Sequence, residues 1–325
     1  MGAPSVAITI VTFNSARFIA HCLRYVFAQD YSNFEVIVVD NASADETIAK
    51  LEPFRARIKL VQNAVNTGFA AGQNQAIALS ASDWVLVLNP DVRLAADFIR
   101  NAIRGGESDE RIGSVSGKLL RMGADFEIPA TKILDSTGIY FTAALRHFDR
   151  GSGETDTGRY DTAEYVFGVT GAAALYRRKM IEDVALSGEF FDSDFFAYRE
   201  DADLAWRAQL LGWKCLYVPS AIAYHVRTVL PENRRSLAAA INMHSVKNRF
   251  LMRIKNITGG LYLRHLFAIT WRDLLVIGAC VVREWSSLPA FFFVLGNHRR
   301  TLEKRREIMR RRRADAKYMA AWFSH

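Results

Sequence analysis

The stretch Ser82-Asp-Trp-Val-Leu-Val-Leu-Asn-Pro-Asp-Val-Arg-Leu94 decides the fold. Its apolar run, Trp84 to Leu88, has no polar position, which is typical of a strand buried on both faces of a parallel sheet. The run ends at Asn89-Pro90-Asp91, where Pro90 has no N–H to donate and so stops the strand. Open α/β sheets bind ligands at the carboxyl ends of their strands, and a carboxylate there suits Mg²⁺ or Mn²⁺ bridging a diphosphate. All three residues are also turn formers, so a plain turn is the alternative.

Three further apolar or β-branched runs precede this one and alternate with helix-like segments. Strands are predicted at residues 6–12, 34–39 and 58–62, each ahead of a segment with helical spacing. Four such repeats predict a doubly wound, mainly parallel half-domain. The residues that follow these strands should therefore meet at one edge of the sheet, the expected nucleotide-binding edge. They are Thr12, Phe13, Asn14, Asp40, Asn66, Thr67, Gly68 and Asp91.

Two of these residues have ligand chemistry and equally ordinary alternatives. Asp40 can accept a hydrogen bond from a nucleobase N–H or a ribose hydroxyl, but it could also cap the next helix. Gly68 lets the backbone approach a ligand closely, although a simple turn needs glycine as well. The sequence has no Gly-x-Gly-x-x-Gly after the first strand, no Walker A loop and no Gly-x-Ser-x-Gly elbow. The motifs of dinucleotide, P-loop and serine-hydrolase sites are therefore excluded.

Residues 105–161 are less regular and are predicted to form an antiparallel insertion that shapes the acceptor side, followed by a strand at 165–176. Beyond it, Glu200 and Asp201 are adjacent at the start of a helix and follow an aromatic run. This placement favours a partly desolvated pair that acts as a general base. Acids at a helix N-terminus are also stabilised by its dipole, by about 0.3–1 kcal/mol each, so capping is the alternative. The position of His225 alone favours a core or rim residue over a metal ligand.

Six of these stretches, in this order, resemble the family 2 inverting glycosyltransferases, whose nucleotide-diphospho-sugar-binding fold is called GT-A. They lie at residues 11–15, 38–45, 66–74, 88–91, 200–207 and 212–225, and the likeness covers about residues 5–255. Within the family it is greatest toward bacterial rhamnosyltransferases and galactofuranosyltransferases of the cell envelope. The resemblance implies a GT-A catalytic domain over residues 1–230, with a nucleotide-binding half at 1–104 and an acceptor and catalytic half at 105–230.

The family pattern gives the residues at the predicted edge a role in binding the nucleotide-sugar donor. It makes Asp40 a contact to the nucleobase or ribose. The other donor contacts that it implies are Thr12, Phe13, Asn14, Asn66, Gly68, Asn89, Asp91 and Arg207.

The same pattern implies a divalent metal, Mg²⁺ or Mn²⁺. Asp91 becomes a metal ligand, because it is the last residue of what is usually an Asp-x-Asp motif, and His225 becomes the second. Asn89 departs from the pattern, since many members have Asp there. The metal would therefore rest mainly on Asp91, His225 and the donor diphosphate.

For the reaction, the resemblance implies a single displacement that inverts the anomeric configuration. Asp201 would deprotonate the acceptor hydroxyl, with Glu200 or Asp203 in support. The expected enzyme transfers L-rhamnose from dTDP-L-rhamnose to a polyprenyl-diphosphate-linked or other glycan acceptor in cell-envelope polysaccharide biosynthesis. A galactofuranosyl or other UDP-sugar transferase is the alternative within the family.

The C-terminal region, residues 231–325, is strongly basic. It holds 19 Lys and Arg against 6 Asp and Glu, whereas the rest of the chain holds 23 against 28. Charges at helical intervals among the apolar residues of 261–282 suit an amphipathic helix in a membrane interface, and the longest uncharged piece, 274–282, is far shorter than the roughly 20 residues needed to span. The cationic run 299–313 would attract anionic lipid. We therefore expect a cytoplasmic protein that is peripheral on the inner face of the plasma membrane.

Other uses of the C-terminal region remain open. Its helices could pack on the body of the protein or form a homodimer. Nucleic-acid binding through residues 310–313 is not expected, because no helix-turn-helix, RNA-recognition or zinc motif accompanies the charge. A catalytically silent scaffold is a further alternative, which Asn89 suggests. Cys22, Cys215 and Cys280 are too few and too widely separated for a disulfide framework or a cysteine zinc site, which fits a reducing cytosol.

Overall fold

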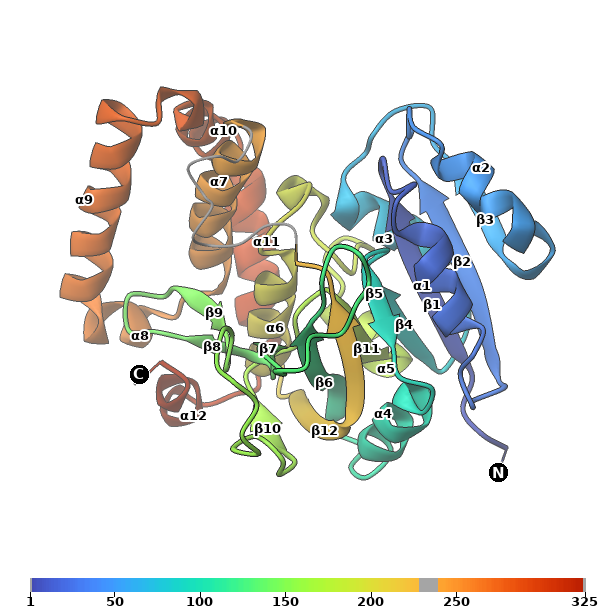
Figure 1. Ribbon diagram of the computed structural model, residues 1–325. Helices are drawn as coiled ribbons and strands as arrows, with labels where there is room; N and C mark the ends of the chain where they lie inside the picture. Colours follow the sequence, from blue (N-terminus) through green and yellow to red (C-terminus); the bar gives the residue numbers. More distant parts are fainter. Residues whose placement is uncertain (1, 228–238, 324–325) are drawn as a thin grey trace.

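The apolar run from Trp84 to Leu88 forms a strand, β4, whose five residues are all buried. It lies within a mixed sheet in the computed structural model of the chain, which describes residues 2–227 and 239–323 (Figure 1). The strands are β1 Val6–Thr12, β2 Phe34–Asp40, β3 Lys59–Gln62, β4, β5 Val92–Leu94, β6 Ile112–Arg121, β7 Leu134–Ser136, β8 Ile139–Phe141, β9 His147–Asp149, β10 Glu164–Val166, β11 Ala173–Arg177 and β12 Lys214–His225. The α-helices are α1 Ile19–Val26, α2 Thr47–Leu51, α3 Phe69–Ala78, α4 Phe98–Gly106, α5 Arg178–Val184, α6 Glu200–Leu210, α7 Ala239–Asn256, α8 Gly259–Arg264, α9 Leu266–Val282, α10 Pro289–Gly296, α11 His298–Arg311 and α12 Ala316–Ala321.

The first half of the sheet is parallel, as predicted. β1 lies between β2 and β4, and β3 pairs with the outer side of β2. Successive residues of these strands point to opposite faces, where α1 and α4 cover one side and α3, α5 and α6 cover the other. The carboxyl ends of the strands coincide, because Thr12 pairs with Asp40 and Ile10 pairs with Leu88. The residues that follow these strands therefore lie at one edge of the sheet.

The second half departs from the prediction of an antiparallel insertion at residues 105–161. β6 is a central strand, antiparallel to β11 and parallel to β12, and nine of its ten residues are buried. Its glycines made the segment look irregular, but packing requires them. A Cβ on Gly113 would lie 2.4 Å from the sulfur of Met180, and one on Gly117 would lie 2.4 Å from the Ala221 carbonyl oxygen. The short strands β7, β8 and β9 are the antiparallel pieces of this range.

The strand predicted at residues 165–176 is interrupted, because β10 ends at Val166 and β11 begins at Ala173. Between them, the backbone N–H of Gly171 donates to a carboxylate oxygen of Asp201 at 3.0 Å. β11 then pairs antiparallel with β4, with Ala173 opposite Leu88. The break therefore brings the loop before β11 against the start of α6.

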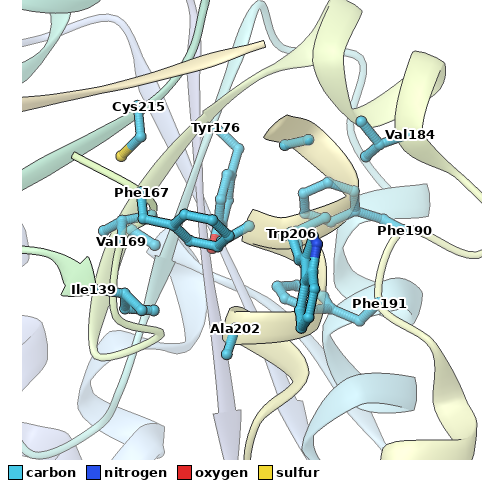
Figure 2. Packing of buried hydrophobic residues seen from close by; sticks show 14 of the residues in the cluster. Ile139, Phe167, Val169, Tyr176, Val184, Phe190, Phe191, Ala202, Trp206 and Cys215 are labelled. Carbon is cyan, nitrogen blue, oxygen red and sulfur yellow. The ribbon is translucent and has the colours of Figure 1, made fainter. Parts of the chain in front are cut away.

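An aromatic core fixes α6 between the sheet and the end of the described chain. Trp206 of α6 is fully buried, and Figure 2 shows it among Phe167, Phe190 and neighbouring apolar side chains. The Trp206 ring lies 5.2 Å from that of Phe141 and 4.9 Å from that of Phe323, measured between centroids. Burial of a side chain such as Phe contributes about 1.5–3 kcal/mol. These contacts set the position of the helix that begins with Glu200 and Asp201.

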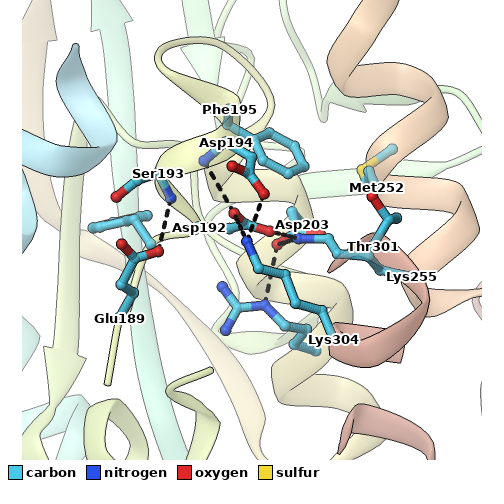
Figure 3. A network of polar contacts seen from close by, with 12 residues as sticks. Glu189, Asp192, Ser193, Asp194, Phe195, Asp203, Met252, Lys255, Thr301 and Lys304 are labelled. Carbon is cyan, nitrogen blue, oxygen red and sulfur yellow. Dashed lines mark hydrogen bonds and ion pairs between the residues drawn. The ribbon is translucent and has the colours of Figure 1, made fainter. Parts of the chain in front are cut away.

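Buried lysines join the C-terminal helices to the sheet domain (Figure 3). Lys304 of α11 lies 2.6 Å from Asp192 and 2.7 Å from Asp194. Lys255 of α7 pairs with Asp192 and also lies 3.0 Å from Asp203. Removing one partner of such a buried pair costs about 3–5 kcal/mol. Part of the basic charge of the C-terminal region is thus neutralised inside the protein, where α7 and α11 pack on the body.

The helix α9 has a different environment. Its inner residues Val276 and Cys280 pack with Val246 of α7, and Ile269 is buried in the main core cluster, while the helix itself stands apart from the sheet (Figure 1). Several apolar side chains of α9 are exposed, and we call six of them the α9 stripe: Phe267, Trp271, Leu274, Leu275, Val281 and Val282. Among the described residues, no helix has both the length and the apolar character required to cross a bilayer. The predicted boundary between residues 230 and 231 lies outside the described residues.

Candidate functional site

Asp40 is held at the carboxyl end of β2 by three hydrogen bonds. The Thr12 hydroxyl donates to Oδ1 at 2.8 Å, and Ser43 donates to Oδ1 from its hydroxyl at 2.6 Å and to Oδ2 from its backbone N–H at 3.0 Å. The next helix, α2, begins only at Thr47, so Asp40 does not cap it, which was the alternative that the sequence left open. Asp40 is 2% exposed, and a carboxylate accepts about four hydrogen bonds, so one of its acceptor positions is not used by these three contacts.

The loop after β1 lies against the loop after β2. Asn14 adopts the left-handed conformation with φ of 50°, its backbone N–H donates to the Ser43 hydroxyl at 2.9 Å, and its side-chain oxygen accepts from the Ala44 N–H at 2.9 Å. These bonds fix the backbone beside Phe13, whose side chain is 50% exposed. An exposed ring at this edge can stack on a nucleobase.

The loop before α3 completes this side of the edge. Asn66 Oδ1 accepts from the Gly68 N–H at 2.9 Å, and Gly68 has φ of +85°. A Cβ on Gly68 would lie 2.6 Å from the Phe196 ring, so only glycine fits here. Sequence reasoning gave no role to Asn41, whose amide donates to the Gly68 carbonyl at 3.0 Å and accepts from the Thr67 hydroxyl at 3.0 Å. In the sequence, the position of Asn41 directly after Asp40 could have indicated that it also lies at this edge of the sheet.

Asp91 and His225 face each other across the pairing of β5 with β12. The register places Val92 opposite His225, and the imidazole Nε2 lies 3.4 Å from an Asp91 carboxylate oxygen. On the other side of the ring, Nδ1 lies 2.8 Å from Asp135, which is almost fully buried. Burial lowers the pKa of His225, but Asp91 and Asp135 outweigh it and raise that pKa to about 10. Sequence reasoning missed Asp135, which lies 90 positions from its partner.

Asp91 and His225 have the chemistry to bind a divalent cation that is also coordinated by the phosphate oxygens of a bound nucleotide. Within residues 2–227 and 239–323, no group of three or more His, Cys, Asp or Glu side chains is arranged to hold a metal alone. Asp91 and His225 therefore supply two ligands, and phosphate oxygens would have to supply others. A carboxylate together with an imidazole suits Mn²⁺, whereas Mg²⁺ prefers oxygen ligands throughout. Asn89, two positions before Asp91, has no charge and so adds no carboxylate to this pair.

Asp201 and Glu200 lie together at the first turn of α6. Asp201 accepts from the Gly171 N–H at 3.0 Å and from the Ala202 N–H at 2.7 Å. Burial raises the pKa of Asp201, and these backbone bonds oppose the shift. Burial also raises the pKa of Glu200 to about 8, with a further contribution from the Asp201 charge. With a pKa of about 8, Glu200 keeps its proton at neutral pH, so Asp201 is the member of the pair that is placed to accept one.

A strained loop leads into α6, since Phe196, Tyr198 and Arg199 all have φ between 64° and 71°. Such conformations cost about 1–3 kcal/mol each and persist where the surroundings hold them. Here the Asn248 amide of α7 donates to the carbonyls of Phe195, Ala197 and Tyr198 at 2.9, 2.8 and 2.7 Å. The C-terminal region therefore fixes the backbone that precedes Glu200 and Asp201.

Two predicted site residues are placed in the core instead. Arg207, expected as a donor contact, is 1% exposed and donates to Asp203 and to the carbonyls of Val184 and Phe190. Asp203, expected to support the base, is fully buried and accepts from Arg207 and from Lys255 of α7. Both side chains are enclosed by protein, so the structure gives them a supporting role behind α6. Asp203 and Arg207 are four positions apart in a helical segment, and this spacing in the sequence could have predicted an ion pair between them.

The two parts of the candidate site meet where β4 ends. The Asn89 N–H donates to the Ala172 carbonyl at 2.9 Å, and the N–H of the preceding residue, Gly171, donates to Asp201. Asp91 follows two positions after Asn89, and its carbonyl accepts from the Val226 N–H at 3.0 Å. The fold thus brings the loops of Asp40 and Asn66, an aspartate–histidine pair and the Glu200–Asp201 pair to one edge of the sheet. This arrangement can hold a nucleotide diphosphate and deprotonate a hydroxyl beside it.

Comparison with known proteins adds an independent observation. Residues 7–185 match the profile of glycosyl transferase family 2, which is more than half of the chain. The N-acetylglucosaminyl-diphospho-decaprenol L-rhamnosyltransferase of Mycobacterium tuberculosis is 28% identical over 208 residues, which span 58% of this chain and 66% of that protein. The chain thus covers slightly less than two thirds of this relative.

Solved structures share the fold at lower sequence identity. The mannosyltransferase PcManGT from Pyrobaculum calidifontis, in complex with GDP-Man and Mn²⁺, aligns with a TM-score of 0.55 and 19% identity over 99% of this chain and 86% of its own. S. aureus TarS 1–349, in complex with UDP-GlcNAc, aligns with a TM-score of 0.56 and 14% identity over 94% and 90%. The GT-A fold that the sequence predicted is confirmed.

Proposed function

Because this chain belongs to glycosyl transferase family 2, we propose that it transfers L-rhamnose from dTDP-L-rhamnose to a lipid-linked glycan acceptor in cell-envelope polysaccharide assembly. One observation carries the transferase part of the proposal. A partly buried carboxylate, Asp201, lies beside a buried carboxyl group, Glu200, whose pKa is raised to about 8, at the same edge of the sheet as Asp91 and His225. The choice of sugar and acceptor draws support from the rhamnosyltransferase relative, whose name specifies both.

In the proposed reaction, Asp201 accepts the proton of the acceptor hydroxyl. The hydroxyl oxygen then forms a bond to the anomeric carbon while the bond to the nucleoside diphosphate breaks on the opposite side, so the configuration inverts. Asp40 orients the nucleoside through its remaining acceptor position, and Phe13 stacks on the base. Glu200 remains protonated, which spares Asp201 the repulsion of a second negative charge.

Asp91 and His225 are proposed to hold a divalent cation together with the donor diphosphate. When bound, the cation neutralises the negative charge that develops on the departing diphosphate. Asp135 keeps the His225 ring oriented through Nδ1, which leaves Nε2 directed toward Asp91. Solved neighbours of this fold that contain Mn²⁺ support a divalent metal, and the mixed carboxylate and imidazole pair favours Mn²⁺ over Mg²⁺.

A UDP-sugar is the second candidate donor. Several solved neighbours carry UDP or UDP-GlcNAc, and nothing about Asp40 or Phe13 distinguishes uracil from thymine by its contacts. The fold and the proposed catalytic groups would be the same for either donor. Only the identity of the nucleotide and sugar would change.

We also propose that the α9 stripe contacts an anionic membrane surface, where a lipid-linked acceptor would be presented. Phe267, at 89% exposure, and the other stripe residues form an apolar surface on a helix that does not pack on the sheet. Exposed arginines at both ends of α9, Arg264 and Arg283, would contact lipid headgroups. This arrangement supports binding parallel to the membrane surface.

The proposed function is tested with the purified full chain, Mn²⁺ and a synthetic N-acetylglucosaminyl-diphospho-prenol acceptor. dTDP-L-rhamnose and a panel of UDP-sugars are supplied separately, and the glycolipid product is identified by mass spectrometry. We expect product with dTDP-L-rhamnose and no product without divalent metal. If only a UDP-sugar gave product, dTDP-L-rhamnose would be the wrong donor. If no donor gave product, the proposed class of acceptor would be refuted.

A further inference from the structure

Gly171 lies in the loop between β10 and β11 that brings the sheet against the proposed base. Its backbone N–H donates to Oδ2 of Asp201 at 3.0 Å, and the carbonyl of the next residue, Ala172, accepts from the Asn89 N–H at 2.9 Å. The residue is buried. Gly171 is therefore placed between the end of β4 and the first turn of α6, inside the candidate site.

Neither the backbone nor the packing of the protein requires a glycine at this position. Gly171 is not among the residues with positive φ, so an L-amino acid can adopt its conformation. Among the described residues, the nearest atoms that a Cβ on Gly171 would meet, apart from its chain neighbours, lie at 3.7 Å, an ordinary van der Waals distance. Gly168 is the contrast, because a Cβ there would lie only 2.3 Å from that of Ala205 on α6. Close packing explains Gly168 and leaves Gly171 unexplained.

The space beside Gly171 is bounded by the two carboxyl groups of the proposed site. A Cβ on Gly171 would lie 3.7 Å from both Cβ and Oδ2 of Asp201, and 3.9 Å from Oε1 of Glu200. A side chain at this position would therefore cover an oxygen of each group. The glycine leaves room for a carbon-sized group in contact with the proposed base.

The carboxyl pair has hydrogen-bonding capacity that the protein does not use. Each oxygen of Asp201 accepts one backbone N–H, from Gly171 and from Ala202, which leaves further acceptor positions on both. Oε2 of Glu200 makes no hydrogen bond within the described residues. Because burial and the Asp201 charge raise the pKa of Glu200 to about 8, its carboxyl group has an O–H to donate at neutral pH. A sugar with oxygens on adjacent ring carbons complements this pair, since one can donate to Asp201 and the other can accept from Glu200.

We propose that Gly171 is a specificity-determining residue for the acceptor, an inference that rests on the proposed transferase function. The space that a side chain would fill receives the ring C–H group beside the attacking hydroxyl. The acceptor class is therefore a sugar that reacts through a secondary ring hydroxyl and carries a second oxygen on the adjacent carbon. Water does not need this space, because its oxygen is not attached to carbon.

The test compares transfer with hydrolysis of the donor. In transfer, the acceptor hydroxyl oxygen bonds to the anomeric carbon as the bond to the nucleoside diphosphate breaks, and Asp201 takes the hydroxyl proton. In hydrolysis, water supplies the oxygen and the proton. The full chain is assayed with Mn²⁺ and dTDP-L-rhamnose, or the UDP-sugar that gives product with the wild type. Glycolipid is measured with the N-acetylglucosaminyl-diphospho-prenol acceptor, and free sugar is measured without any acceptor over long incubations.

Gly171→Ala should separate the two reactions. A methyl group in this space would displace the acceptor hydroxyl, so transfer should fall at least about tenfold, whereas hydrolysis should change less than about threefold. The variant should melt no lower than the wild type, because alanine is compatible with this backbone and restricts the unfolded chain more than glycine does. Its affinity for UDP in Mn²⁺ should equal that of the wild type. Gly259→Ala, at the start of α8, is the matched control, since a Cβ there meets nothing within 4 Å, and it should change neither reaction.

Two results would overturn the role of Gly171 alone. Unchanged transfer by Gly171→Ala would show that the acceptor does not use this space. Equal losses of transfer and hydrolysis would show that the methyl group disturbs the base or the fold instead of excluding the acceptor. If the wild type neither transfers sugar from any donor nor hydrolyses one, the proposed transferase function fails, and the role of Gly171 fails with it.

Discussion

Asp201 tests the chemistry at the scale of a single residue. Because a positioned general base contributes roughly 10²–10⁴-fold to a rate, Asp201→Asn should lower transfer by at least about 100-fold. The donor contacts at Asp40 are separate from it, so the affinity for the nucleotide should remain within a few fold of the wild type. Asp91→Ala should instead weaken both nucleotide affinity in Mn²⁺ and transfer. Full turnover by Asp201→Asn, measured as product formed per enzyme, would remove Asp201 from this role.

Glu200 makes a prediction about stability and pH. Its pKa is about 8 in the folded protein and 4.5 by its ordinary value, so the folded state keeps a proton that the unfolded chain releases between these values. The stabilisation from the proton on Glu200 is fully present below about pH 4.5. The free energy of unfolding then falls by up to about 1.4 kcal/mol per pH unit as the pH rises to 8. The melting temperature of Glu200→Gln should therefore rise relative to that of the wild type as the pH increases from 5 to 8. If the melting temperatures of the variant and the wild type kept a constant difference across this pH range, Glu200 would be ionised in the folded protein.

The sequence predicts single site residues where the signal is local. Asp40 and Asp91 each follow a buried strand directly, and their positions at the edge follow from the strand register. Asp135 was missed because its partner His225 lies 90 positions away and no local pattern connects them. Arg207 was given a ligand role because it stands near acids in a family motif, whereas the packing of α6 encloses it. Contacts between distant segments decide such cases.

At the scale of elements, α7 controls the strained loop before α6. Asn248→Ala removes an amide that donates to three loop carbonyls, so it should destabilise the protein by about 1–3 kcal/mol. Because the loop precedes Glu200 and Asp201, kcat should fall more than tenfold while the donor KM changes little. Asn297→Ala is the matched control, since it removes a similar bond to the Phe293 carbonyl outside the loop. An unchanged kcat for Asn248→Ala would separate α7 from catalysis.

The elements themselves were predictable to different degrees. β1 and β4 each carry a continuous buried run, so sequence alone locates them within a residue. β6 was not recognised because Gly113 and Gly117 resemble loop residues, although contacts with Met180 and Ala221 are what require them. The break before β11 arises from the Gly171 bond to Asp201, which no periodicity reports. Local patterns thus predict the first half of the sheet better than the second half.

At the scale of the whole molecule, the C-terminal region combines packing with exposure. Its buried lysines join α7 and α11 to the sheet domain, while the α9 stripe remains open to solvent. Sequence composition showed the basic excess but not which charges are paired internally. We propose that residues 1–230 act as the catalytic domain and residues 231–325 as the part that holds the catalytic loop and contacts lipid.

The α9 stripe is tested by vesicle flotation with anionic lipid. The triple variant Phe267→Ser, Trp271→Ser, Leu274→Ser should lower the vesicle affinity more than tenfold, since each inserted side chain contributes about 1.5–3 kcal/mol. A variant with Val65→Ser and Leu79→Ser, two similarly exposed apolar residues of the sheet domain, should float like the wild type. Equal flotation of the triple variant, or absence of wild-type flotation, would contradict membrane contact through α9.

The central claim is that the edge formed by the ends of β1, β2, β4 and β12 binds a nucleotide diphosphate through Asp91 and His225. Anomalous scattering from crystals soaked with UDP and Mn²⁺ tests it most directly. We predict one manganese peak within bonding distance of an Asp91 carboxylate oxygen, His225 Nε2 and the diphosphate, with the nucleoside against Asp40. A manganese peak that contacts neither Asp91 nor His225, or a nucleotide bound at another surface, would contradict the account.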